Sequence, residues 1–194
     1  MKYTCTFLFL LFSCFSFGQT QFQDGDILFQ TTSSAQSKAI QLATASKYSH
    51  VGILFEEADG WYVYEAVQPV RKVPLQEWVR QGSNKHYSIK RYKYSITTSK
   101  RDSMLVYVRS QLGKDYDPYF NWSDEQIYCS ELVWKAFHYV KIDLCTLRKL
   151  KEYQLDHPIV AKKLKERYGH KIPYEELMVS PSDLENSKFV KQIN

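Results

Sequence analysis

The sequence predicts an α+β fold in which an antiparallel sheet packs against helices. Three short apolar segments, 51–55, 61–67 and 70–73, follow one another too closely for helical crossovers, so they read as antiparallel strands. Two amphipathic segments, 33–45 and 100–112, carry apolar residues at helical spacing. A chain of 194 residues with 44% hydrophobic residues and no internal repeat accommodates one globular domain.

The remaining elements of the first half follow from turn and strand patterns. A turn at 24–26 leads into a strand at 27–30, and Ala58-Asp59-Gly60 predicts a hairpin between the second and third strands. Residues 75–79 predict a short helix, and 87–94 alternate as in a further strand.

The second half is predicted to be mainly helical. The helix over 100–112 should end at Gly113, and apolar residues recur at helical spacing from Cys129 to Val140. Asp156-His157-Pro158 predicts a capped helix to Tyr168, and Ser180 to Leu184 a cap with one short turn. We interpret residues from about 146 to 178 as a basic, helical insertion at the edge of the core.

The first 18 residues have the layout of an export signal. Lys2 precedes an apolar run at 7–17, which is too short to span a bilayer, and cleavage is expected near Gly18. The mature domain would be 19–194, periplasmic or secreted, with no transmembrane segment. A lipoprotein anchor at Cys14 is the less favoured alternative, because the flanking residues fit a lipobox poorly.

The net charge of +5 is concentrated in two segments, Lys85 to Arg101 and Leu147 to Lys171. A solvated basic face is the favoured interpretation. The alternative is an anionic lipid or cell-wall surface as partner. Nucleic acid is not expected, because no nucleic-acid-binding motif accompanies the charge.

Export leaves two cysteines, Cys129 and Cys145, which a predicted helix separates by more than a disulfide can bridge. We therefore expect two free thiols. Cys129 would begin its helix, where unpaired N–H groups and the helix dipole favour a thiolate. The alternative for Cys129 is a small buried core residue.

His50 and Glu65 are the candidate partners of this thiol. His50 begins a buried strand that would hold its ring rigidly, and Glu65 is an acid in an otherwise apolar strand. The predicted hairpin returns Glu65 beside His50, where a carboxylate can orient an imidazole. A strand-edge histidine and an exposed edge acid are the alternatives. No zinc-ligand spacing or phosphate-binding loop occurs, so neither a metal nor a cofactor is expected.

These segments resemble a known family. Residues 25–29, 49–53 with 64–66, and 113–117 leading to 128–133 are similar to motifs of the YiiX/YebB-like hydrolases. Those hydrolases are circularly permuted relatives of the NlpC-type papain-like cysteine peptidases. The cysteine segment comes last here, which is the permuted order.

The resemblance implies a circularly permuted papain-like fold, with a sheet or half-barrel against helices. It also implies Cys129 as nucleophile, His50 as general base and acid, and Glu65 as the orienting residue. Tyr128 and Asp26 are implied as neighbours of the site, near the substrate or the oxyanion.

The expected function is hydrolysis of an amide bond, in a peptide or other envelope component, through a thioester acyl-enzyme. A lipid-directed esterase or acyltransferase is the first alternative. The second is a non-catalytic module that binds the envelope, in which Cys129 would be unreactive.

Overall fold

The structure is a computed structural model that describes residues 22–194, so the expected signal segment and Cys14 lie outside the described residues. An antiparallel sheet packed with helices confirms the predicted α+β class. Within residues 22–194, no helix combines the length and hydropathy needed to cross a membrane.

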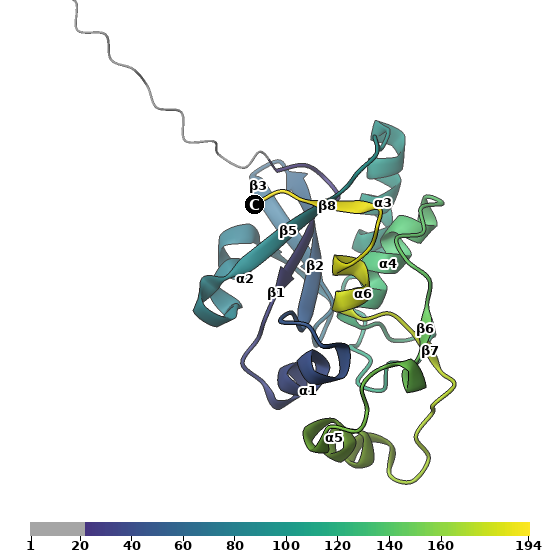
Figure 1. Ribbon diagram of the computed structural model, residues 1–194. Helices are drawn as coiled ribbons and strands as arrows, with labels where there is room; N and C mark the ends of the chain where they lie inside the picture. Colours follow the sequence, from purple (N-terminus) through teal and green to yellow (C-terminus); the bar gives the residue numbers. More distant parts are fainter. Residues whose placement is uncertain (1–21) are drawn as a thin grey trace, which may run out of the picture.

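Strands and helices alternate irregularly along the chain (Figure 1). The strands are β1 (Ile27–Gln30), β2 (His50–Glu57), β3 (Gly60–Glu65), β4 (Arg71–Pro74), β5 (Tyr87–Tyr92), β6 (Arg148–Lys149), β7 (Leu177–Met178) and β8 (Val190–Gln192). The α-helices are α1 (Ala35–Thr44), α2 (Leu75–Gln81), α3 (Thr98–Ser110), α4 (Cys129–Tyr139), α5 (Pro158–Tyr168) and α6 (Pro181–Glu185), and short 3-10 turns occupy Ser83–Lys85 and Leu150–Glu152.

The main sheet has six strands in the order β4-β3-β2-β1-β5-β8, and every neighbouring pair is antiparallel. The hairpin of β2 and β3 turns immediately before Gly60, as the sequence predicted. The chain then crosses from β4 to β5 through α2, and β8 adds the last strand from the C-terminal end. This order places β1 and β2 in the middle of the sheet.

Each face of the sheet is covered by its own hydrophobic core, because alternate residues of a strand point to opposite faces. On the larger side, Phe29 of β1 and Ile53 of β2 pack in one cluster with Phe137 of α4, and all three are fully buried. On the other side, Leu54 packs in a smaller cluster with Trp78 of α2. The first residue of α4 is thereby carried to one end of β2.

The predicted elements differ from the observed ones mainly at the C-terminal end. The helix before Gly113 spans Thr98 to Ser110, and Gly113 takes a positive φ of 81°. β8 was not predicted, because a three-residue edge strand carries little periodicity. The segment 146–178 is less helical than expected, since it contains the β6-β7 ribbon besides α5 and a 3-10 turn.

Acidic neighbours offset much of the basic charge in this segment. Lys149 and Lys151 both pair with Glu175, and Lys162 and Lys163 both lie near Glu166. Exposed pairs of this kind add little to stability. Their effect is to lower the net charge that the segment presents to solvent.

Gly52 is the tightest point of the central hairpin. A Cβ on Gly52 would lie 2.4 Å from Cγ1 of Val63 and 3.0 Å from the carbonyl oxygen of Tyr64, both in β3. We expect Gly52→Ala to lower the free energy of unfolding by about 1–3 kcal/mol, because β3 must move to relieve the clash. Urea unfolding of both proteins checks this, and an unchanged midpoint would contradict it.

Candidate active site

Cys129 is the first residue of α4, as the sequence predicted. Tyr128 is the N-cap residue in an extended conformation, so Cys129 belongs to the first turn of α4, whose backbone N–H groups have no partner within the helix. The Cys129 residue is 4% exposed, yet it lines two cavities. Both Cys129 and Cys145 are free thiols. A buried sulfur that still faces open space suits a nucleophile better than a core residue.

The start of α4 is tied to the chain that follows β7. The phenolic oxygen of Tyr128 accepts a hydrogen bond from the backbone N–H of Val179 at 3.2 Å, and the hydroxyl of Ser130 donates to the Val179 carbonyl at 2.8 Å. The backbone N–H of Tyr128 donates to Glu131 in the first turn of the helix. These bonds fix Cys129 from both sides, and they give Tyr128 a positioning role.

His50 and Glu65 meet at the open end of the β2-β3 hairpin. Nε2 of His50 lies 2.6 Å from Oε2 of Glu65, and both residues are buried. Cys129 lines the same cleft as His50 and Glu65, and its side chain is near enough to the ring to raise the pKa of His50. Since Nε2 faces the carboxylate, Nδ1 is the ring nitrogen that remains for the sulfur. The structure therefore brings the three predicted residues together, with the imidazole in the middle.

The carboxylate of Glu65 receives two further donors. Trp78 Nε1 donates to it at 2.9 Å, and Arg71 donates from Nε at 2.9 Å. Burial alone would raise the pKa of Glu65, but the hydrogen bonds and positive charges of His50 and Arg71 hold it below its ordinary value. Glu65 is thus a buried anion with every oxygen satisfied.

The resulting environment favours a charged imidazole. Burial alone would lower the pKa of His50, but hydrogen bonds to Cys129 and Glu65, and the negative charge of both, raise it to about 10. At neutral pH the ring of His50 is therefore an imidazolium beside the Glu65 carboxylate. A cationic ring near a sulfur at a helix N-terminus is an arrangement that can activate a cysteine nucleophile.

Tyr116 and Gln36 complete the surroundings of the sulfur. Gln36 Nε2 donates to the phenolic oxygen of Tyr116 at 3.0 Å, and both side chains line a cavity with Cys129. Burial and the negative charge of Cys129 both raise the pKa of Tyr116, which places the phenol close to the sulfur. Arg167 of α5 donates to the oxygen of the same carboxamide, with its Nη2 at 3.4 Å from Oε1 of Gln36.

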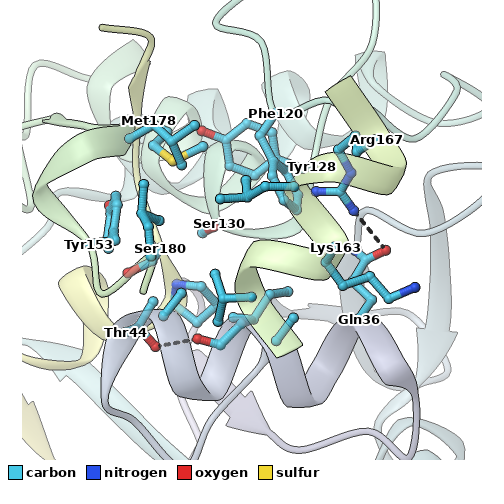
Figure 2. A pocket seen from close by; sticks show the side chains of 18 of the residues that line it. Gln36, Thr44, Phe120, Tyr128, Ser130, Tyr153, Lys163, Arg167, Met178 and Ser180 are labelled. Atoms are coloured by element: carbon cyan, nitrogen blue, oxygen red, sulfur yellow. Dashed lines mark hydrogen bonds between the residues drawn. The ribbon is translucent and has the colours of Figure 1, made fainter. Parts of the chain in front are cut away.

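Cys129 lies where two unlike cavities meet. A cleft of about 350 Å³ contains His50 and Glu65, and most of the residues that line it have polar side chains. A smaller cavity of about 100 Å³ is lined by residues of α1 and α5. Its walls are mostly apolar side chains from the 146–178 segment and from α1. Figure 2 shows this second cavity, with Lys163 and Arg167 beside Gln36 at one end and Met178 at the other. A substrate at the sulfur can extend in either direction.

Asp26 does not lie among these residues. It is fully buried before β1 and forms a two-pronged ion pair with Arg91, with N–O distances of 2.7 and 2.8 Å. The other end of β1, at Gln30, is the end that pairs with His50. The expectation that Asp26 neighbours the site is therefore corrected: its position fits a structural ion pair.

Sequence reasoning missed four neighbours of the site. Tyr116 lies inside the motif 113–117, which could have pointed to it. Arg71, Trp78 and Gln36 carried no signal, because each reaches the site from an element whose packing the sequence does not reveal.

The Glu65→Gln variant tests the electrostatics of this site. Loss of the carboxylate charge should lower the pKa of His50 by about 1–3 units from its value near 10, because the anion favours the imidazolium. Because folding raises the pKa of His50, its protonated ring stabilises the native state. This stabilisation is complete below pH 6.5, the ordinary pKa of histidine, and is lost as the pH rises through about 10. NMR titration of the histidine rings measures the shift, and an unchanged His50 pKa would contradict it.

The comparisons with known proteins agree with the fold. Residues 21–193 match the family described as "Permuted papain-like amidase enzyme, YaeF/YiiX, C92 family". The chain is 43% identical over 182 residues to YiiX of Escherichia coli (strain K12), covering 93% of this chain and 90% of YiiX. It is also similar to a crystal structure described as metalloprotein yiiX from Escherichia coli O157:H7, with a TM-score of 0.85 and 42% identity. That match covers 89% of this chain and 96% of the other. The chain therefore belongs to the permuted papain-like amidase family C92.

Proposed function

We propose that this protein is a cysteine hydrolase that cleaves an amide bond through a thioester acyl-enzyme formed on Cys129. The contact of one imidazole with both a helix-terminal thiol and a buried carboxylate is the observation that carries the proposal. It supplies a nucleophile, a proton carrier and an orienting group in a single row.

The reaction begins when the thiolate of Cys129 attacks the carbonyl carbon, and the carbonyl π electrons move to oxygen. As the oxyanion collapses, the C–N bond breaks and the nitrogen takes the proton of His50. Neutral His50 then accepts a proton from water, whose oxygen attacks the thioester. The C–S bond breaks, which releases the acid and restores the thiolate. Glu65 keeps the ring in place through both steps.

Two donors are placed to stabilise the oxyanion. One is the backbone N–H of Cys129, at the positive end of α4. The other is the phenol of Tyr116, whose oxygen already accepts a hydrogen bond from Gln36, so that its own proton can serve the substrate. Tyr128 is a positioning residue in this proposal, because it holds the first turn of α4 in place.

A metal is not part of this mechanism. The crystal structure of the relative is described as a metalloprotein, but in residues 22–194 of this chain no group of three or more His, Cys, Asp or Glu residues could hold a metal ion. His50 Nε2 is bonded to Glu65, and the remaining bonds to that carboxylate come from the donors Arg71 and Trp78. The residues present therefore do not fit a metal site, and no step is assigned to one.

The expected export signal makes the bacterial envelope the proposed place of action, with a peptide or another envelope amide as substrate. The apolar cavity favours a second candidate, a lipid-like amide or ester. Ala39 of α1 and Leu164 of α5 both line this cavity, whose mostly apolar surface suits an alkyl chain better than a charged peptide. With an acceptor other than water, the same thioester would make the protein an acyltransferase.

Substitution of the nucleophile is the direct test of the reaction. Cys129→Ala should abolish both hydrolysis and the mass increase of a trapped acyl-enzyme, whereas Cys145→Ser should retain both, because Cys145 lies outside the site. Intact-protein mass spectrometry after incubation with activated acyl esters measures this. Acylation that persists without Cys129, or envelope binding without any acylation, would favour the non-catalytic alternative.

A cavity-filling pair tests the lipid-like candidate. Ala39→Leu should lower kcat/KM for octanoyl substrates by about tenfold relative to acetyl substrates, because the added carbons of leucine occupy the space of the chain. Ala161→Leu places the same change on the exposed side of α5 and should leave the ratio unchanged. Equal ratios in both variants would remove the alkyl chain from this cavity.

A further inference from the structure

The cleft beside His50 is polar but nearly free of charged side chains. Its walls contain four carboxamides, Gln30, Gln36, Gln68 and Gln81, together with serine and threonine hydroxyls. Among the described residues that line it, the acids and bases other than the phenol and the thiol are His50 and Glu65, which neutralise each other.

This cleft is the side on which the leaving group departs. His50 and Glu65 line the polar cleft and are absent from the walls of the apolar cavity, whereas Cys129 lines both. The leaving group takes its proton from the general acid, so it must lie on the side of the imidazole. The acyl group then extends the other way, past Cys129.

Gln30 stands next to the proton donor. It is paired with His50 across the β1-β2 ladder, and directly paired residues carry their side chains on the same face of the sheet, about 5 Å apart. Gly82 lies behind it, so close that a Cβ there would sit 2.4 Å from Gln30 Oε1. The carboxamide of Gln30 thus packs against the backbone of Gly82, where no side chain intervenes.

The oxygen of Gln30 is the one carboxamide oxygen of this cleft with a hydrogen bond still to make. Oε1 of Gln36 accepts from Arg167, that of Gln68 from the Tyr116 N–H, and that of Gln81 from Arg71. Oε1 of Gln30 is buried in a residue that is 1% exposed, and it has no partner within residues 22–194. A buried acceptor without a partner costs free energy, which a donor on the substrate would recover once the carboxamide turns from Gly82 toward the cleft that Gln30 lines.

We propose that the enzyme selects substrates whose leaving group is uncharged and carries a hydrogen-bond donor, such as a hydroxyl or an amide N–H, and that Gln30 recognises it. The inference rests on the proposed cysteine hydrolase, because it takes the leaving-group side from the position of His50. Charged leaving groups are disfavoured because the cleft offers them no counter-ion.

A set of four amides that share one acyl group tests the proposal on the wild-type enzyme. The amines are ethanolamine, propylamine, glycine and ethylenediamine, which place a hydroxyl, a methyl, a carboxylate and an ammonium at nearly the same position. The acyl group is octanoyl or an N-acetyl dipeptide, whichever acylates Cys129 faster from its p-nitrophenyl ester. All four amides form the same acyl-enzyme, so differences in kcat/KM report the leaving group alone.

We expect kcat/KM for the ethanolamide to exceed that for each of the other three amides by at least about tenfold. Gln30→Met should bring the ethanolamide down to the level of the propylamide, and Gln30→Glu should favour the ethylenediamine amide instead. Gly82→Ala, at a φ of −71° that alanine adopts freely, should also weaken the preference by displacing the carboxamide. Gln154→Glu adds the same charge at an exposed position outside both cavities and should change nothing.

The two proposals fail in different ways. If no acyl group is transferred to Cys129 from either activated ester, the cysteine hydrolase itself is overturned. If acylation occurs but the four amides react equally, or if the preference survives both Gln30→Met and Gly82→Ala in folded protein, the role of Gln30 is overturned and the hydrolase stands.

Discussion

The contact of one imidazole with a thiol on one side and a carboxylate on the other is the interaction on which this site depends. Three separate elements must agree to make it. The β2-β3 hairpin places His50 beside Glu65, α4 brings Cys129 to the end of β2, and Trp78 of α2 anchors the carboxylate. Each charge is costly to bury alone, so the three groups are stable there only as a set.

The sulfur also divides the space available to a substrate. On the imidazole side the walls are uncharged carboxamides and hydroxyls, and on the other side they are apolar. In the proposed hydrolase, this asymmetry would give the scissile bond a direction, because His50 can protonate only the product that leaves on its own side. Gln36 belongs to both walls and links them through Tyr116 and Arg167.

Much of the core could be predicted from the sequence, because strand alternation and helix periodicity are local signals. The same holds for the thiol at a helix start and for the acid returned by a hairpin, which made Cys129, His50 and Glu65 foreseeable. Whether an acid within a motif faces the site depends on packing between distant parts of the chain. Asp26 could not be placed from the sequence, because its partner Arg91 lies 65 residues away. The β6-β7 ribbon was missed because two-residue strands leave no pattern.

The anchoring of α4 to Val179 couples two parts of the molecule that sequence order separates. Val179 directly follows the 146–178 segment, and its N–H and carbonyl both hold the turn that carries the nucleophile. The wall of the apolar cavity and the start of α4 are therefore connected through the hydrogen bonds of Val179. In the proposed hydrolase, evolution of a new acyl preference through this segment would also move the helix turn that carries Cys129, which favours gradual change in the wall over its complete replacement.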